Sequence, residues 1–522
     1  MQIALPQLNY KAGDIAGNSE KIISAIHKAQ QNKAELIVFP ELAVCGALPQ
    51  DFLEQEDFIT ESRMAIEKIA SHCTRIAAIV GAPNLDSTNG IMYNSAYFIQ
   101  NGEVVDGVHK NILSDYDIFN ESRYFIAGED NTPIRYKNQN IRIIFDEYEA
   151  EYIENKDSFV ILLGMTPFTQ DSLQTKKQTV TALARKYGKN IIALNHCGSY
   201  TSVLFDGNSF FSTHQGKIVY QLAGFEEDFQ IIDTNKTGNL PALPHHPENK
   251  IALIHQALVF GIKDYFRKHG FSKAILGLSG GIDSAVVAAL AAEALGSENI
   301  MGLLMPSHFS SDHSVADAKA LARNLNIPHE IIPIGEIYEQ YLKNLHPLFQ
   351  NHPFNVAEEN IQARIRGMLV MATSNKFGYI ALNTSNKSEA AVGYGTLYGD
   401  LCGSLGVIGD LYKTEVYELA AYLNREKEII PQHTISKAPS AELRPGQKDQ
   451  DSLPEYDQLD AILKRFIEEN ETPEKIIAQG YPQETVRKII RLLYQNDYKR
   501  AQCPPIIKIS KRSFGTGRKY PF

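Results

Sequence analysis

The chain has 522 residues, more than one hydrophobic core usually holds, so two or three domains are expected. A net charge of -10 without a sustained Lys/Arg run excludes a nucleic-acid backbone as a partner. The five cysteines have neither the pattern of a disulfide framework nor a zinc-binding spacing, and no membrane segment or signal peptide stands out, so we expect a cytoplasmic protein.

Residues 2–232 alternate short β-rich runs with amphipathic helical patterns. The runs that we predict to be strands are residues 36–39, 76–80, 141–145, 159–163, 191–195 and 209–212. This alternation favours a layered α/β domain, which we assign to residues 1–240. The stretch between residues 233 and 249 is rich in breakers and polar residues, so we place the domain boundary there.

Glu41 and Lys110 are the candidate catalytic residues of this first domain. Glu41 follows the strand at residues 36–39, and Lys110 lies past a hairpin-like segment. The arrangement is similar to the Glu and Lys of the nitrilase superfamily, whose Glu-Lys-Cys triad hydrolyses amides. The resemblance implies an α-β-β-α layered fold in which the Glu is the base and the Lys steadies the tetrahedral anion.

The cysteine of that triad is missing from its expected position at the end of a strand, where this chain has Phe145. Phenylalanine has no lone pair to attack a carbonyl, so we expect amide hydrolysis at this position to be lost. Cys45 and Cys197 are alternative thiols, and we disfavour both because acyl transfer tolerates little displacement of the nucleophile.

The segment expected to bind glutamine also departs from the superfamily pattern. Residues 166–168 are Thr-Pro-Phe instead of Ser-Pro-Phe, and Ser172 stands near the place expected for a Lys, whereas Tyr116 matches a glutamine contact. We therefore predict a glutaminase-inactive domain in which Glu41 and Lys110 are remnants or a structural ion pair.

From residue 248 to residue 522 the pattern predicts a second domain. Helices and strands alternate as helix 250–268, strand 274–278, helix 285–295, strand 300–304, helix 314–325 and strand 379–383. This order favours a doubly wound parallel sheet with a nucleotide site at the carboxyl ends of its strands.

A glycine turn joins the first of these strands to the next helix. The turn and its flanks are Gly277, Leu278, Ser279, Gly280, Gly281, Ile282, Asp283 and Ser284. Backbone N–H groups and hydroxyls at the start of a helix form an anion site, here expected to hold a phosphate. The Lys of a Walker loop is absent, and the Ser-Gly-Gly-x-Asp-Ser form resembles the pyrophosphate-binding loop of ATP pyrophosphatases, the adenine nucleotide α-hydrolase-like fold.

Four further segments, residues 355–366, 383–389, 393–400 and 439–445, resemble NAD synthetases, most closely the long, two-domain, glutamine-dependent branch. In that family the nicotinate carboxylate of deamido-NAD attacks the α-phosphate of ATP, and ammonia then displaces AMP. The resemblance implies ATP and Mg²⁺ as cofactors and a homo-oligomer, a dimer or higher.

The resemblance also implies the roles of single residues. Thr384 and Lys413 join the loop as nucleotide contacts, and Asp283 and Lys413 are the catalytic candidates. Mg²⁺ is expected on Asp283 and Glu389, because carboxylate oxygens suit this ion. Deamido-NAD is expected to meet the following residues: Asn360, Arg364, Glu389 and Lys499.

Three of these assignments have alternatives. Thr384 is also a plausible helix cap, and a lone Lys such as Lys413 is usually a solvated surface charge. Arg364 and Arg366 are two apart on a predicted helix and cannot face the same way, and we favour Arg364.

Together these features predict an NAD synthetase that amidates deamido-NAD with free ammonia. The main alternative is a glutamine-hydrolysing synthetase that uses a different nucleophile or a partner glutaminase. Others treat the first domain as an interaction module that binds a ligand without chemistry, or treat the chain as a GMP- or tRNA-modifying synthetase, which the acidic charge and the downstream segments disfavour.

Overall fold

The computed structural model describes residues 1–244, 249–350 and 352–518. The chain divides into two compact units, Met1–Pro247 and Glu248–Phe522. Residue 248, at which the second predicted domain begins, lies outside the described residues. Each unit is considered by itself.

The first unit contains two six-stranded sheets. One has the order β14-β1-β2-β3-β4-β5 and the other the order β13-β12-β9-β8-β7-β6. The strands of the first sheet are β1 (Gln2–Gln7), β2 (Leu36–Val38), β3 (Ala77–Asp86), β4 (Ile91–Gln100), β5 (Glu103–His109) and β14 (Asp228–Asp233). Those of the second are β6 (Ile134–Tyr136), β7 (Gln139–Ile144), β8 (Phe159–Leu163), β9 (Ile191–Leu194), β12 (Phe210–Ser212) and β13 (Ile218–Gln221). A separate ribbon pairs β10 (Cys197–Tyr200) with β11 (Val203–Asp206).

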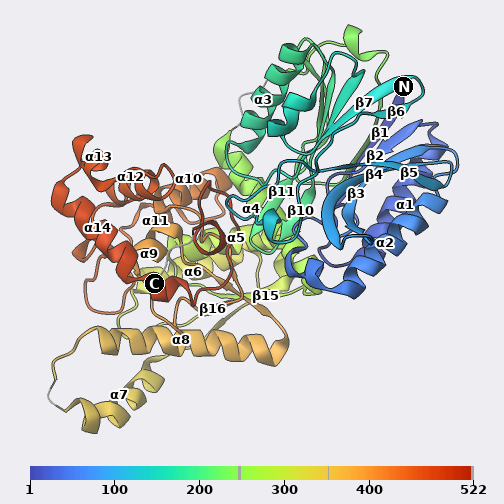
Figure 1. The fold of residues 1–522 in the computed structure, drawn as a ribbon. Coiled ribbons are helices and arrows are strands. Elements are labelled where there is room, and N and C mark those ends of the chain that lie inside the picture. The colour runs from blue at the N-terminus through green and yellow to red at the C-terminus, as the bar shows by residue number, and fades with distance from the viewer. Residues whose placement is uncertain (245–248, 351, 519–522) are drawn as a thin grey trace. The chain divides into compact units, whose positions relative to one another are not determined.

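Helices cover the outer faces of the two sheets, as Figure 1 shows. Helices α1 (Ile15–Gln31) and α2 (Glu56–Ser71) pack with the first sheet, and α3 (Ser172–Tyr187) packs with the second. Apolar side chains of both sheets, such as Leu36 and Ile161, form the core between them. The α-β-β-α arrangement predicted for this unit is therefore confirmed.

The second unit is built on a five-stranded parallel sheet with the order β17-β16-β15-β18-β19. Its strands are β15 (Ala274–Gly277), β16 (Ile300–Leu304), β17 (His329–Ile331), β18 (Ile380–Asn383) and β19 (Leu405–Gly406). The larger helices are α4 (Lys250–His269), α5 (Ile282–Leu295), α6 (Asp312–Leu325), α7 (Gly335–Phe349), α8 (Val356–Phe377) and α10 (Lys413–Leu423). The remaining helices are α9 (Lys387–Val392), α11 (Gln432–Ser436), α12 (Tyr456–Ile467), α13 (Pro473–Ala478), α14 (Gln483–Gln495) and α15 (Asp497–Arg500).

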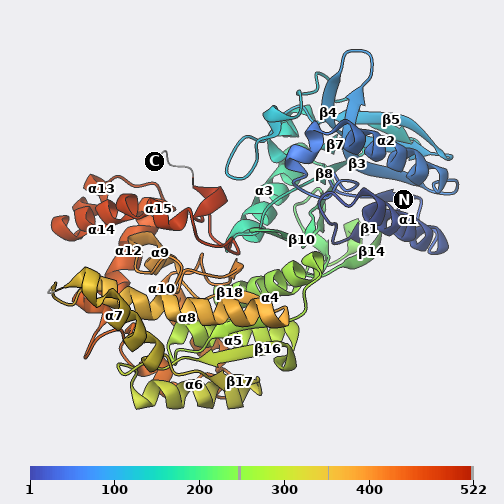
Figure 2. The ribbon, with the colours of Figure 1, turned by 90° about the horizontal axis from the view of Figure 1, so that it is seen from below.

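Helices lie on both faces of this sheet, with α5 against α4 and α10 on one side and α8 with α7 on the other (Figures 1 and 2). Ten residues of α5 are buried, because its small and apolar side chains surround the helix. The predicted doubly wound sheet is confirmed. Helix α5 begins at Ile282, three residues before the predicted start, because Gly281 is already its N-cap.

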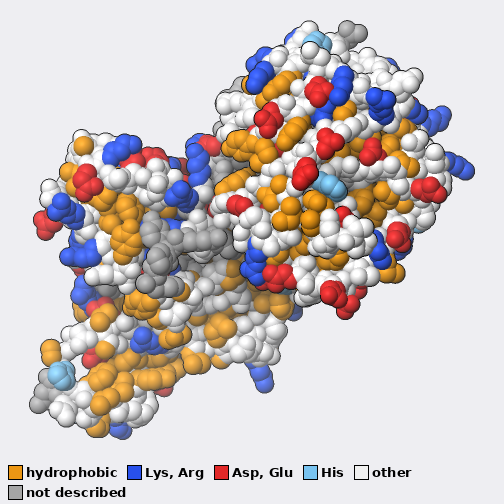
Figure 3. Space-filling model, in the orientation of Figure 1, with side chains coloured by type: hydrophobic (Ala, Val, Ile, Leu, Met, Phe, Trp, Pro, Cys, Tyr) orange, Lys and Arg blue, Asp and Glu red, His pale blue; other side chains and the backbone are white. Residues whose placement is uncertain are grey.

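Large apolar side chains remain exposed on α7 and α8, where Figure 3 shows a band of hydrophobic surface. Leu348 of α7 and Met368 of α8 are among them. The expected homo-oligomer stays a prediction. Over the described ranges, none of the helices has the length and apolarity needed to span a bilayer.

Candidate functional site

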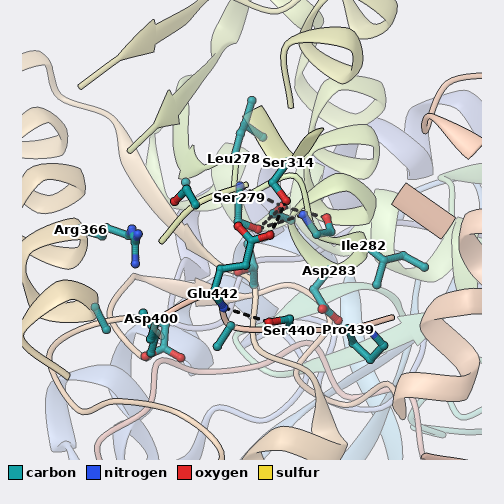
Figure 4. Close-up of a pocket in the computed structure, with 18 of the residues that line it drawn as sticks. Leu278, Ser279, Ile282, Asp283, Ser314, Arg366, Asp400, Pro439, Ser440 and Glu442 are labelled. Carbon is teal, nitrogen blue, oxygen red and sulfur yellow. Dashed lines mark hydrogen bonds between the residues drawn. The ribbon is translucent and has the colours of Figure 1, made fainter. Parts of the chain in front are cut away.

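A cavity of about 660 Å³ opens at the carboxyl ends of β15, β16 and β18 in the second unit. This is the edge at which doubly wound sheets bind their ligands. Its lining joins the loop after β15, the start of α6, one side of α8 and the segment 438–449 (Figure 4). Segments far apart in the chain therefore meet at one place.

The loop after β15 has the form that its glycines require. Gly280 has φ +78°, and a Cβ atom there would lie 2.2 Å from the carbonyl oxygen of Ser314. The Ser279 hydroxyl accepts a bond from Gly281 N (3.1 Å), and the Ser284 hydroxyl donates to Gly281 O (3.0 Å). The N–H groups of the first turn of α5 have no intrahelical acceptor, so this edge of the cavity suits an anion.

The centre of the charge arrangement is Lys413, whose ammonium group lies 2.5 Å from Asp283 Oδ2 and 3.4 Å from Glu389 Oε1. Burial and the neighbouring charge of Asp283 raise the pKa of Glu389 to about 8. Burial by itself would lower the pKa of Lys413, but the two carboxylates outweigh it and raise that pKa. The side chain of Asn386 caps α9 and also donates to Asp283 Oδ1 (2.9 Å).

The two alternative explanations for Thr384 and Lys413 do not hold. Thr384 lines the cavity, and Asn386, not Thr384, is the N-cap of the following helix. The Lys413 side chain is only 2% exposed, so it is not a solvated surface charge. The structure thus brings both predicted nucleotide contacts to the predicted loop.

The residues predicted to meet deamido-NAD lie elsewhere, with the exception of Glu389. Asn360 accepts a bond from the Thr396 hydroxyl, and Arg364 donates to Leu397 O. Lys499 donates to the carbonyl oxygens of Gly393 and Gly395. These three side chains gather around residues 393–397, of which Thr396 lines the cavity.

Arg366, which sequence reasoning passed over in favour of Arg364, is the arginine of this pair that lines the cavity. Its guanidinium group donates to Met305 O (3.0 Å), and burial lowers its pKa to about 10. Arg364 is exposed on α8. The two-residue spacing predicts that the pair diverges, but not which member faces inward.

Glu442 was not predicted as a site residue. It accepts bonds from the hydroxyls of Ser311 (2.7 Å) and Ser314 (2.8 Å), and so ties the segment 438–449 to the start of α6 (Figure 4). The only signal in the sequence was the resemblance of residues 439–445 to NAD synthetases. The partners of Glu442 lie more than 120 residues earlier and could not be read from that signal.

Asp283 and Glu389 also fit the expected metal. Among the described residues, no group of three or more His, Cys, Asp or Glu side chains could hold a metal ion. Mg²⁺ usually takes one or two carboxylates and completes its shell with water and substrate phosphates. Two carboxylates beside a loop that suits an anion therefore fit Mg²⁺ better than a metal held by protein alone.

A second charged cluster lies in the first unit. Lys110 Nζ lies 2.9 Å from Glu41 Oε1 and 2.8 Å from Glu121 Oε2, and all three side chains are buried. The amide of Asn94 donates to both carboxylates. Burial and the charge of Glu121 raise the pKa of Glu41 to about 8, although Lys110 opposes this. Glu121 and Asn94 were not predicted.

Phe145 directly follows β7, and its side chain belongs to the core between the two sheets. Its N–H donates to Glu149 Oε2 (2.9 Å), and Glu149 Oε1 also accepts from the N–H groups of Asn111 and Ile112. A buried carboxylate thus holds the chain after Lys110 beside the end of β7.

The two alternative thiols have other surroundings. Cys45 lies in the core beneath α1 and α2 with its Sγ 3.7 Å from the Ser62 hydroxyl, and burial raises its pKa to about 12. Cys197 is buried in the ribbon of β10 and β11, opposite Asp206.

Ser172 stands near the position where a lysine that binds glutamine is expected, and it is the first residue of α3. One turn later, Lys176 donates to Leu194 O (2.8 Å). Burial lowers the pKa of Lys176 to about 8.

Comparisons with known proteins bear on both units. The carbon-nitrogen hydrolase family matches residues 2–237, and the NAD synthase family matches residues 254–503. The glutamine-dependent NAD(+) synthetase of Synechocystis is 42% identical, with 99% of this chain and 98% of that protein covered. The enzyme of the same name from Acinetobacter baylyi is 38% identical over 100% of this chain and 98% of its own.

Solved structures similar to this chain also cover both of its units. The glutamine-dependent NAD+ synthetase of Acinetobacter baumannii, solved with adenosine diphosphate, superposes with a TM-score of 0.81 at 36% identity over 100% of this chain and 98% of its own. The enzyme of Cytophaga hutchinsonii has a TM-score of 0.85 at 21% identity, covers 100% and 97% of the two chains, and supports the fold.

The prediction of free ammonia as the preferred nitrogen donor is wrong. Full-length relatives at 35–42% identity are named glutamine-dependent, whereas the prediction rested on Phe145 and on the departures at residues 166–168 and 172. The matches over both units and the 42% identity show that the chain belongs to the two-domain NAD synthetase family.

Proposed function

We propose that this protein makes NAD from deamido-NAD with ATP, and that the amide nitrogen comes from glutamine. The observation that carries the proposal is the cavity of about 660 Å³, in which the loop after β15 and the Asp283–Lys413–Glu389 group lie together. The full-length relatives named glutamine-dependent NAD(+) synthetase support the choice of donor. Location in the cytoplasm is part of this proposal.

The loop residues 277–284 hold the phosphates of ATP, with Thr384 at the same edge of the cavity. N–H groups at a helix start stabilise phosphate charge without moving, because the backbone already orients them. Arg366 adds a cation from α8, and its fixed bond to Met305 O keeps it in place. Binding ATP here leaves its α-phosphate open to the carboxylate of the second substrate.

Asp283 and Glu389 would hold Mg²⁺, and the ion would supply positive charge that favours loss of pyrophosphate. Lys413 balances the two carboxylates and keeps them from repelling one another. Its ammonium group, held beside the same phosphates, stabilises charge that develops during adenylation.

Deamido-NAD lies along residues 393–397, where Arg364 and Lys499 bond backbone carbonyl oxygens and Asn360 accepts a bond from the Thr396 hydroxyl. Its nicotinate carboxylate is adenylated, and nitrogen from glutamine then displaces AMP. The domain ranges 1–240 and 248–522 correspond to the supply of nitrogen and to NAD formation, respectively.

The test is NAD formation by the purified full chain from deamido-NAD and Mg-ATP, with ammonia-free glutamine compared to ammonium chloride. We expect glutamine to support turnover, with one AMP and one pyrophosphate for each NAD. Turnover with ammonium chloride but none with glutamine would overturn the proposed donor. No turnover with either would overturn the synthetase function itself.

A further inference from the structure

The Glu41–Lys110–Glu121 cluster contains a hydroxyl that no triad pattern predicts. The Ser114 hydroxyl lies 3.4 Å from Lys110 Nζ, and the Ser114 side chain is buried in the same cluster. Its backbone N–H donates to Glu121 Oε2 (2.6 Å), so the carboxylate that binds Lys110 also positions this serine.

Polar atoms beside the cluster lack partners. Asn111 follows Lys110 and is 9% exposed, and within the described part of the chain neither of its side-chain polar atoms has a hydrogen-bond partner. The Oδ1 atom of Asn94, whose amide nitrogen donates to Glu41 and Glu121, also has no partner among the described residues. Buried donors and acceptors left open in this way cost free energy, so they indicate a polar ligand. A carboxamide offers both a donor and an acceptor.

We propose that Ser114 is the nucleophile that attacks the side-chain amide of glutamine, in place of the cysteine absent at position 145. The inference rests on the proposed glutamine-dependent function and identifies the residue that releases the nitrogen. In this proposal neither Cys45 nor Cys197 has to move toward the substrate. The Ser114 hydroxyl already lies beside Lys110, the lysine that would stabilise the tetrahedral anion.

The step balances with the groups present. The Ser114 oxygen forms a bond to the amide carbon, its proton passes to the Glu41 carboxylate, and the anionic oxygen is stabilised by the Lys110 ammonium group. The carbon–nitrogen bond then breaks, and Glu41 returns the proton to the leaving nitrogen, which departs as ammonia. Water attacks the resulting ester with Glu41 again as base, which releases glutamate and restores the hydroxyl.

The geometry also explains why the base needs no direct bond to the hydroxyl before substrate binds. Glu41 and Ser114 both contact Lys110 Nζ, at 2.9 Å and 3.4 Å, so they flank one ammonium group. Catalytic hydrogen bonds are often long without substrate and shorten in the substrate complex. Tyr116, which matches a glutamine contact, lies two residues after Ser114 and is exposed.

The experiment uses the full chain with Ser114→Ala, Ser114→Cys and the matched control Ser122→Ala, an exposed serine of the same loop. Glutamate release from glutamine is measured beside NAD formation with ammonium chloride. We expect Ser114→Ala to lose at least about 100-fold in glutamate release with unchanged ammonium-driven turnover, because it removes the nucleophile alone. Ser114→Cys should retain measurable release, and Ser122→Ala should match the parent.

A second measurement locates the covalent bond. A diazoketone analogue of glutamine, 6-diazo-5-oxo-L-norleucine, should label the peptide that contains Ser114, and Ser114→Ala should abolish the label. Label on Cys45 or Cys197, or glutamate release by Ser114→Ala within twofold of the parent, would overturn the role of Ser114 and leave the proposed function standing. No glutamate release by the parent would overturn both.

Discussion

Replacing Lys413 tests most directly how the charged groups in the cavity of the second unit are held together. Lys413→Met replaces a buried cation with an uncharged side chain of similar length. Asp283 and Glu389 then lie near each other without the positive charge that separates them. Removing one partner of a buried ion pair typically costs about 3–5 kcal/mol. At about 2–3 °C for each kcal/mol in a unit of this size, the unfolding temperature should fall by roughly 6–15 °C.

The double variant Lys413→Met/Glu389→Gln separates charge repulsion from lost packing. At pH 9, above the pKa of about 8 of Glu389, Glu389→Gln removes one of the two unbalanced carboxylates and should restore at least about 1 kcal/mol of the loss, as coupled neighbours do. Calorimetric unfolding of the full chain is the assay, and the exposed Lys427→Met is the control. The reasoning is refuted if Lys413→Met unfolds within about 2 °C of the control, or if Glu389→Gln lowers the temperature further.

Three further outcomes follow from single positions. Gly280→Ala should weaken ATP binding at least about 10-fold. A Cβ atom would collide with the Ser314 carbonyl oxygen, and an alanine at φ +78° costs about 1–3 kcal/mol. Unchanged ATP affinity would contradict the loop geometry. Arg366→Met should raise KM for ATP and Arg364→Met should not, because only Arg366 of this pair lines the cavity. Equal effects of the two variants would argue against Arg366 as an ATP contact. Glutamate release should rise with pH through about 8, because Glu41, facing Lys110 and Glu121, acts as a base only when ionised; a flat profile between pH 6.5 and 9 would exclude it.

Local sequence patterns predicted the fold class because each depends on residues close together in the chain. An apolar strand, a glycine turn and a small-residue helix at residues 274–295 can be recognised from spacing, and the structure has them there. The alternation of short strands and helices before residue 240 likewise predicted a layered α/β domain, and the resemblance at Glu41 and Lys110 implied the α-β-β-α arrangement that the structure has. The helix start at Ile282 was missed, since a glycine N-cap gives no side-chain signal.

Reasoning from departures at single positions gave the wrong nitrogen donor. Phe145 stands where a cysteine is expected, and from it and the changes at residues 166–168 and 172 followed the wrong prediction of free ammonia as donor. The buried carboxylates Glu121 and Glu149 and the amide of Asn94 had no motif to draw attention to them. Asn94 lies on β4, whereas Glu121 and Glu149 lie in short 3-10 helices, and only the folded unit brings these segments to the chain around Lys110.

The sequence by itself determined the chemistry available: a glycine-rich loop at residues 277–284, acidic and basic candidates, and no cysteine at position 145. Tertiary structure decided which of these groups meet. Lys413 reaches Asp283 across 130 positions, Lys110 reaches Glu41 across 69, and Arg366 rather than Arg364 turns inward. Such pairs depend on strand order, on register and on which face of a helix is buried. These are set by the packing of the whole unit, and residue spacing along the chain carries no record of them.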